Sequence, residues 1–374
     1  MGPSGLALAG VTILATGVVT VAGIRAPLTV AVIGLMLFGV LHNVLEIRHV
    51  LGTFSALLTP TVLGLVGILV LGIMAARVWG PSARLFEILL GYGVLAVGLG
   101  IGHRRNQPEP DLPERGAQRE VGGRRHTRSG RWWRTLGWGL AIAAGLGLSL
   151  THPALHVVAL AHLHNLVPLA FLWWWAARLP RTGRRAFRAA QVAWVVVVPA
   201  IVLAGVTDRW IRPAPDLVAG FGPGVAAVAR GVATPGADVV WGTRLLVVFA
   251  ILQTMHYLVW VGFFPRFGSD AVARFEARWP PLTNRRVVVA AVAVALVFAV
   301  VFWADYAQGR AWYAVLATFH AYLEFPILLA MLVGVAQRKA DSDTINTATP
   351  TVDTSRLSRR DDATPPLPTR RRIA

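Results

Sequence analysis

The 374-residue sequence contains no cysteine. This absence excludes disulfides, iron–sulfur clusters, thiolate-ligated haem, covalently attached c-type haem and a cysteine nucleophile. Any metal site must therefore draw its ligands from His, Asp, Glu or Tyr. The His-Glu-x-x-His protease motif, the Walker lysine motif and the Gly-x-Ser-x-Gly elbow are absent as well, so these three kinds of active site are not expected.

Charged residues are scarce. They make up 14% of the chain, against roughly 25% in soluble domains, while hydrophobic residues make up 55% and the mean hydropathy is +0.58. Apolar runs of about 20 residues recur, and a helix of that length crosses a membrane. The runs lack the period-two alternation of barrel strands, so they predict helices. We therefore expect an all-α integral membrane protein, a polytopic bundle of about ten transmembrane helices, at 5–24, 27–48, 56–77, 85–102, 136–151, 154–177, 189–206, 242–264, 287–304 and 311–336.

Lysine occurs only once, at Lys339, although the chain has 36 basic residues and a net charge of +18. The arginines lie in segments beside the apolar runs, where they set orientation and contact anionic lipid headgroups. We therefore expect membrane lipids as partners and no nucleic acid, and the sequence identifies no protein partner. The Ala-, Val- and Arg-rich composition is typical of a GC-rich bacterial genome, which predicts a multi-pass protein of a bacterial cytoplasmic membrane.

The basic segments fix the expected orientation, because an even number of spans separates them. Segments 103–135, 178–188 and 265–286 and the chain from Arg338 fall on one side of ten spans. The positive-inside rule makes that side, and both termini, cytoplasmic. The expected organisation is helices 1–4 in 1–102, a basic disordered cytoplasmic loop in 103–135, helices 5–10 in 136–338 with an external 207–241 loop, and a disordered cytoplasmic tail in 339–374.

Histidine is concentrated in the apolar spans, and two glutamates accompany it. The second span ends in His42, Glu46 and His49, whose i, i+4, i+7 spacing puts them on one helical face. His320 and Glu324 form another i, i+4 pair. An acid at the centre of a membrane helix costs about 2.5–3.5 kcal/mol on insertion scales. Both glutamates therefore require partners.

Topology predicts which histidines meet. His42, His164, His256 and His320 lie on even-numbered spans, which all run from outside to inside. Counted from the outer ends they lie about 13–23 Å deep at 1.5 Å per residue. Four imidazoles and two carboxylates at similar depth are the ligands that a two-metal site needs, so the expected metal ligands are His42, Glu46, His164, His256, His320 and Glu324.

Secondary candidates surround this set. His162 and His164 lie about 200° apart around a helix, so only one of them faces a common site, and Pro168 permits a kink that favours His164. His49, His156 and His162 are secondary ligand candidates. Tyr257 and Tyr322 are candidate proton or radical donors, and we expect Glu46 and Glu324 to share the catalytic role.

The sequence favours a membrane-embedded metalloenzyme, a non-haem iron oxygenase or related oxidoreductase acting on an apolar lipid, fatty acyl or isoprenoid substrate. Iron is preferred because such substrates offer C–H or C=C bonds, and zinc or manganese stay open. A haem b protein would explain paired histidines but not the glutamates. A proton- or ion-coupled transporter would use the His/Glu pairs as a relay. The fourth interpretation is a structural membrane protein in which the histidines pack.

Overall fold

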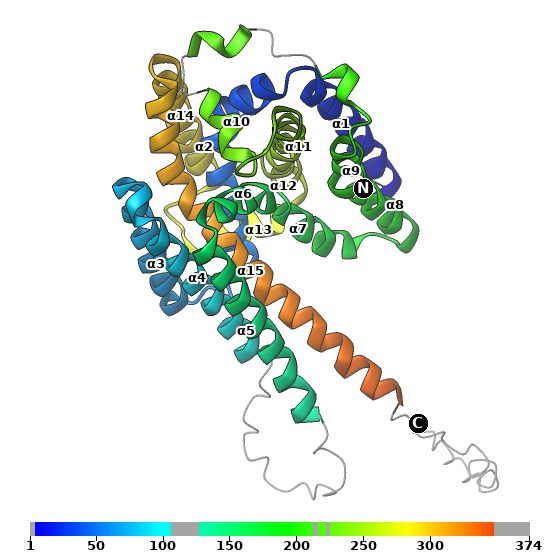
Figure 1. Ribbon diagram of the computed structural model, residues 1–374. Coiled ribbons are helices and arrows are strands. Elements are labelled where there is room, and N and C mark those ends of the chain that lie inside the picture. Colours follow the sequence, from blue (N-terminus) through cyan, green and yellow to red (C-terminus); the bar gives the residue numbers. More distant parts are fainter. Residues whose placement is uncertain (1–3, 106–126, 212–215, 222–224, 348–374) are drawn as a thin grey trace, which may run out of the picture. The chain divides into compact units, whose positions relative to one another are not determined.

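The computed structural model describes residues 4–105, 127–211, 216–221 and 225–347, and every element in these ranges is helical (Figure 1). The chain divides into residues 1–334 and a second unit from 335, of which the described part is the end of the last helix. The expectation of an all-helical protein is confirmed. Residues 106–126 of the predicted basic loop 103–135, and the part of the predicted tail beyond Thr347, lie outside the described residues.

Twelve α-helices of the described chain make up most of the predicted spans. They are α1 (Gly5–Arg25), α2 (Pro27–Thr53), α3 (Pro60–Trp79), α4 (Arg84–Arg105), α5 (Thr127–Thr151), α6 (Pro153–His164), α7 (Val167–Trp175), α8 (Arg181–Val192), α9 (Val198–Leu203), α11 (Val239–Tyr257), α14 (Asn284–Ala304) and α15 (Tyr306–Thr347). The other elements are η1 (Pro81–Ala83), η2 (Ala176–Arg178), η3 (Ala193–Val197), η4 (Asp208–Trp210), η5 (Asp216–Phe221), α10 (Ala226–Val232), η6 (Leu258–Phe263), α12 (Phe264–Phe267) and α13 (Ser269–Arg278).

Nine helical segments of the described chain are long and apolar enough to cross a membrane, and a shorter apolar helix covers Thr135–Thr151. These ten correspond to the ten expected spans and indicate a multi-pass membrane protein. Several ends differ from the prediction. The fifth helix begins at Thr127 and the last one runs from Tyr306 to Thr347, so both continue into polar segments expected to be disordered.

The helix ends have local causes. Ser4, Thr59, Asp238 and Thr283 precede helices, and their side chains accept hydrogen bonds from backbone N–H groups of the first turn. Pro27, Pro60 and Pro153 occupy first-turn positions, where a missing N–H is tolerated. The chain therefore turns at the points where polar caps and prolines interrupt the apolar runs.

Helix α2 packs against α11, α13 and α14. Its C-terminal half approaches α13 so closely that a Cβ on Gly52 would lie 1.9 Å from the carbonyl oxygen of Ala271. Arg274 donates to the Gly52 carbonyl (2.9 Å), and Arg278 donates to the carbonyls of Ser55 and Leu58 (both 2.7 Å). These arginines satisfy carbonyls that the end of α2 leaves free, so they hold that helix in place.

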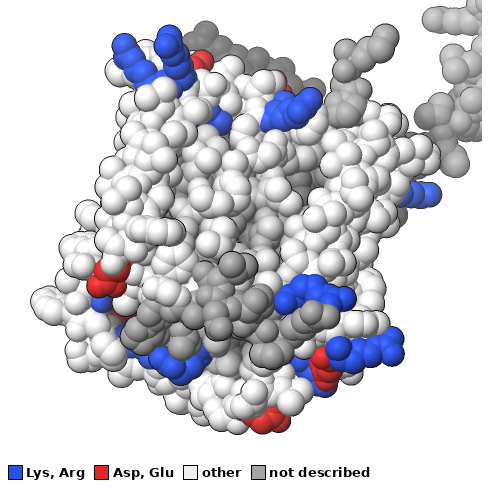
Figure 2. Space-filling model, turned by 90° about the horizontal axis from the view of Figure 1, so that it is seen from above, with Lys and Arg blue, Asp and Glu red and all other residues white. Residues whose placement is uncertain are grey.

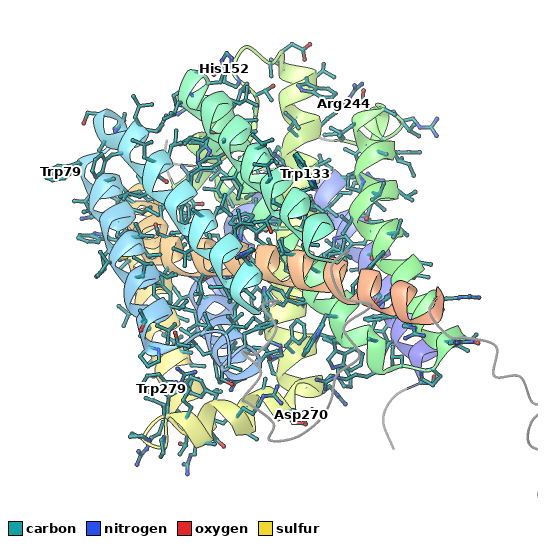
Figure 3. All side chains as sticks on the ribbon, turned by 90° about the horizontal axis from the view of Figure 1, so that it is seen from below. Trp79, Trp133, His152, Arg244, Asp270 and Trp279 are labelled. Atoms are coloured by element: carbon teal, nitrogen blue, oxygen red, sulfur yellow. The ribbon has the colours of Figure 1, made fainter. Side chains whose placement is uncertain are left out.

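The surface agrees with a membrane environment. Many large apolar side chains are exposed, among them Leu14, Ile68 and Val300. On the face in Figure 2, most of the charged side chains lie toward two opposite edges with uncharged surface between them. Figure 3 shows His152 and Arg244 toward one end of the bundle and Asp270 and Trp279 toward the opposite end. His152 and Arg244 lie at the starts of spans 154–177 and 242–264, which are predicted to begin outside, whereas Asp270 and Trp279 lie in the basic segment 265–286, which is predicted to be cytoplasmic.

Two irregular segments adjoin the site described below. The predicted span 154–177 breaks at Asn165–Leu166, between α6 and α7, and Asn165 donates its side-chain amide back to the Ala161 carbonyl (2.8 Å). Pro168, which cannot donate a helical hydrogen bond, follows the break. The second is the π-helical segment η6, which begins directly after His256 and Tyr257. Irregular turns of this kind reorient neighbouring side chains.

Candidate metal centre

Four helices, α2, α6, α11 and α15, each contribute one histidine to a single cluster. One ring nitrogen from each of His42, His164, His256 and His320 lies within 4.8 Å of the others. The Nε2 atoms of His42 and His320 are 3.4 Å apart, and those of His320 and His164 are 3.0 Å apart. We call these four residues the histidine cluster.

Tetrahedral coordination at about 2.0–2.1 Å would place ligand nitrogens about 3.3 Å from one another. The two measured Nε2 separations, 3.0 and 3.4 Å, lie on either side of that value. The rings of the cluster also lie close together, with centroids 4.5–6.4 Å apart. The spacing of the donors therefore fits one ion held among four imidazoles.

Two of the rings have their tautomer set by a partner. His42 Nδ1 lies 3.0 Å from the Phe38 carbonyl, which can only accept, so Nδ1 carries the proton and Nε2 keeps its lone pair. His164 Nδ1 lies 3.1 Å from Glu324 Oε2, which orients Nε2 toward His320 in the same way. Metal-bound histidines ordinarily donate their other N–H to a carbonyl or carboxylate. The cluster shows both kinds of partner.

The two glutamates extend the site. Carboxylate oxygens of Glu46 and Glu324 and one nitrogen of His256 form a second group within 4.8 Å, so His256 belongs to both groups. Glu46 Oε2 lies 3.9 Å from His256 Nε2. The two overlapping groups could hold two ions. They could also hold one ion with the glutamates orienting His164 and His256.

The burial of these ionisable side chains is energetically costly. Glu46 and Glu324 are 1% and 0% exposed, and His256 is 0% exposed. Within the described chain, five buried atoms of these side chains make no hydrogen bond: both carboxylate oxygens of Glu46, both ring nitrogens of His256 and Oε1 of Glu324. A buried polar atom left without a partner costs about 1–3 kcal/mol, and a charged one costs more. A cation among these atoms would offset that penalty, because it would give the lone pairs a partner and balance the carboxylate charge.

A cavity of about 280 Å³ opens onto the histidine cluster. His42, His164 and His320 lie in its wall together with Asn165, Gln253 and three tyrosines, Tyr257, Tyr306 and Tyr313. Two arginines, Arg77 and Arg310, also line it. The remaining wall is apolar, made by Ala31, Leu35, Val157, Leu160, Ala161, Val228, Gly231, Val232, Phe249, Ala314, Ala317 and Ala321. A mostly apolar cavity with a few convergent polar groups is the usual form of a small-molecule site.

The candidate tyrosines take different places. Tyr257 lies in the cavity wall, with its ring centroid 4.5 Å from that of His42 and its hydroxyl accepting a hydrogen bond from Gln253 (2.6 Å). Tyr322 lines a separate cavity of about 260 Å³, and its hydroxyl lies 3.5 Å from Glu87 Oε1. Tyr322 follows His320 by two positions, so the two side chains point about 200° apart around α15, which accounts for their different directions.

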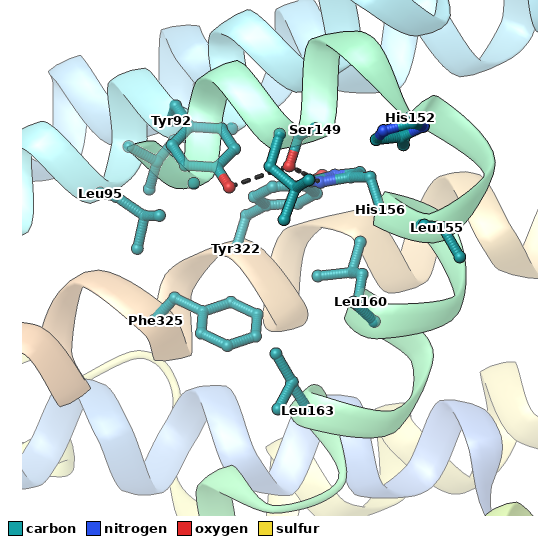
Figure 4. A pocket seen from close by; sticks show the side chains of 15 residues that line it. Tyr92, Leu95, Ser149, His152, Leu155, His156, Leu160, Leu163, Tyr322 and Phe325 are labelled. Atoms are coloured by element: carbon teal, nitrogen blue, oxygen red, sulfur yellow. Dashed lines mark hydrogen bonds between the residues drawn. The ribbon is translucent and has the colours of Figure 1, made fainter. Parts of the chain in front are cut away.

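The secondary histidines do not belong to either group in the described chain. His162 lies 3.0 Å from the Val232 carbonyl, and His49 packs its ring on Phe264 with a centroid separation of 4.2 Å. His156 lines the second cavity (Figure 4), where its Nδ1 lies 3.0 Å from Ser149 Oγ. Each of these side chains thus has a local partner.

Sequence reasoning missed three polar residues of the cavity wall, Tyr306, Arg310 and Tyr313. They precede His320 on α15, and the successive steps from Tyr306 to Arg310, Tyr313 and His320 are four, three and seven residues. Those spacings return to the same helical face, so a heptad-like stripe leading to His320 was the available signal.

Comparison with known proteins identifies no relative: no family model, no curated protein and no solved structure matches this chain.

Proposed function

We propose that this protein is a membrane-embedded metalloenzyme, a non-haem iron oxygenase or related oxidoreductase that acts on an apolar lipid or isoprenoid substrate. The observation that carries the proposal is the buried histidine cluster, with its ring nitrogens within 4.8 Å of one another, at the wall of a largely apolar cavity. A packing role would satisfy the ring nitrogens and carboxylates with hydrogen bonds. Here several of them have none in the described chain.

In this proposal His42, His164, His256 and His320 hold the metal, and Glu46 and Glu324 either ligate a second ion or orient the histidines. A bound iron would supply the redox chemistry with dioxygen that side chains lack. Imidazole-rich sites also suit zinc, and carboxylate ligands are compatible with manganese. The preference for iron therefore rests on the cavity. Its aliphatic wall suits a substrate that offers C–H or C=C bonds to a redox centre.

The residues of the chain supply binding and protection. Aliphatic side chains of α2, α6, α10 and α15 hold an apolar substrate against the cluster and exclude water from it. Tyr257, whose ring contacts that of His42, is the candidate proton or radical donor on the cavity side. Tyr322 faces the second cavity and has a weaker claim to that role.

The contact between the imidazole rings argues against haem b. A bis-histidine haem places the porphyrin plane between its two axial rings. In the histidine cluster the rings pack against one another, with centroids as close as 4.5 Å for His164 and His256. A proton- or ion-coupled transporter that uses the same His/Glu groups remains the second candidate, and the buried carboxylates Glu46 and Glu324 are the observation in its favour.

The proposed setting is a bacterial cytoplasmic membrane with both termini in the cytoplasm, membrane lipids around the bundle and no nucleic-acid partner. The basic composition and the placement of arginines next to apolar spans support it.

The test is metal analysis, absorption spectroscopy and oxygen uptake with lipid substrates, on protein purified in a non-ionic detergent. We expect stoichiometric iron in the wild type and in His162→Ala, a matched control whose histidine bonds a carbonyl instead. Iron should be lost in His320→Ala and diminished in Glu324→Ala. A Soret band would instead assign haem. Metal-free protein that carries a proton-coupled flux in liposomes would assign transport.

A further inference from the structure

We propose that the cavity beside the histidine cluster binds a single-chain amphiphile with a carboxylate head, which Arg310 and Tyr306 hold while the chain extends toward His320. This inference rests on the proposed function in one respect, since it names the substrate class of the same site. Its test does not require a metal.

Four of the polar residues that line the cavity lie along one face of α15. Tyr306, Arg310, Tyr313 and His320 all line the cavity, at successive spacings of four, three and seven residues. At 1.5 Å per residue, the levels of Arg310 and His320 are about 15 Å apart along the helix axis. A ligand that reaches from one to the other is therefore an extended molecule.

Among the described residues, no acidic side chain pairs with Arg310. Within the described chain its guanidinium makes no ion pair or hydrogen bond, and its Nη2 atom lies against the backbone of α10, 3.2 Å from where a Cβ on Gly231 would stand. The nearest acid in sequence, Asp305, is exposed and caps the start of α15, where it accepts from the Gln308 N–H (3.0 Å). An unpaired guanidinium on a mostly apolar wall is a site for a carboxylate or phosphate, which it binds through two parallel hydrogen bonds.

The other arginine of the cavity differs in this respect. Arg77 donates to Glu87 through Nε (2.8 Å), pairs with the same oxygen through Nη2 (2.7 Å), and donates through Nη1 to the Ala314 carbonyl (2.8 Å). Arg77 is therefore satisfied by the protein. Only Arg310 of the two is available to a ligand.

Tyr306 supplies the second donor. Its side chain is 1% exposed, and its hydroxyl lacks a hydrogen-bond partner in the described chain. It lies one helical turn from Arg310 on the same face, so both can reach one head group. A buried hydroxyl without a partner carries a desolvation penalty that a bound carboxylate would remove.

Apart from Tyr313, whose level on α15 lies between Arg310 and His320, much of the remaining cavity wall is apolar and includes Val228 and Val232 of α10, Leu35 of α2 and Ala317 of α15. At about 280 Å³ the cavity is near the lower limit for ligand sites, about 300 Å³, which suits one hydrocarbon chain better than two. An unpaired arginine of the described chain, a largely apolar wall and the histidine cluster thus occur in one cavity. This order matches a fatty carboxylate whose chain, not its head, approaches the cluster.

The experiment is photolabelling of the full chain in nanodiscs with laurate that carries a diazirine at its tail, followed by peptide mapping. We expect label on the α15 segment around Ala317 and Ala321, competed by laurate but not by dodecanol or dodecyltrimethylammonium. Arg310→Gln should weaken competition by laurate about tenfold to a hundredfold, since a hydrogen bond to a charged group contributes about 1.5–3 kcal/mol.

Arg209→Gln is the matched control, because Arg209 is exposed and stacks on Trp210 at the protein surface. It should leave laurate competition at the wild-type level. Label confined to outward-facing residues, equal competition by dodecanol, or an equal effect of both arginine variants would overturn the proposal and make Arg310 a headgroup contact. If Arg310→Gln does not fold, the competition series on the wild type decides alone.

Metal content measured on the same samples separates the two proposals. Specific labelling without bound metal would retain the carboxylate site and reject the metalloenzyme. Bound metal without laurate competition would do the reverse.

Discussion

Replacing Glu46 with Gln should change stability in opposite directions with and without metal. Both oxygens of Glu46 are buried, and neither accepts a hydrogen bond in the described chain. Leaving such a group unsatisfied costs about 1–3 kcal/mol, and a carboxylate costs more. Glu46→Gln exchanges the carboxylate for a neutral amide at nearly constant volume, so it removes only the part of the penalty that comes from the charge, and metal-free protein should become more stable by at most about 1–3 kcal/mol.

The same substitution should weaken metal binding. Loss of a group that orients a metal ligand reduces affinity by about 10–100-fold, or roughly 1.4–2.7 kcal/mol, and loss of a direct ligand reduces it further. The assay is denaturant unfolding in detergent with chelator and with added metal, together with the metal Kd from chelator competition. Glu87→Gln is the matched control. Glu87 pairs with Arg77 (2.7 Å), so its replacement should destabilise the metal-free and the metal-bound protein alike. A less stable metal-free Glu46→Gln protein, or an unchanged Kd, would refute the reasoning.

Two further predictions concern the fold around the site. Gly52→Ala would force a Cβ against the Ala271 carbonyl and should destabilise the protein by about 1–3 kcal/mol or more. Gly64→Ala should be tolerated, because no atom lies within 4 Å of the added Cβ. Thermal unfolding of both variants tests this difference. Arg244 hydrogen-bonds to Asp208 and lowers the pKa of that carboxyl below its ordinary value of 3.8. The ion pair should therefore stabilise the protein above about pH 4, and this stabilisation should be lost as the pH falls through the lowered pKa of Asp208. A stability–pH profile in which Asp208→Asn shows the same acid dependence as wild type would contradict this prediction.

The sequence predicted the helices well because membrane spans are set by length and hydropathy alone. Ten apolar ranges correspond to nine long helical segments and one shorter apolar helix. The ends were harder to predict. Helix α5 begins at Thr127 and α15 continues to Thr347, although both stretches are polar and were expected to be disordered.

The cluster could be predicted in part because two geometric constraints acted on it. The four histidines lie on even-numbered spans, which all cross the membrane in the same direction. The angle between His162 and His164 around their helix allowed only one of the two to face a common site. The structure brings His164 to the cluster and directs His162 to Val232. Rotation about each helix axis was not determined by hydropathy, since these helices are apolar on most faces. For that reason Arg310 was not recognised as a cavity residue. The divergence of Tyr322 from His320 follows instead from the angle of about 200° between positions two residues apart on a helix, a signal that was available in the sequence.

The central claim, a metal held by four histidines, is tested most directly by X-ray absorption on purified, metal-loaded protein. The account predicts a first shell of nitrogen and oxygen at about 2.0–2.2 Å with the outer-shell scattering of several imidazoles. That signal should persist in His162→Ala and disappear in His320→Ala. Protein that binds no metal after reconstitution, or an identical spectrum from His320→Ala, would contradict the account.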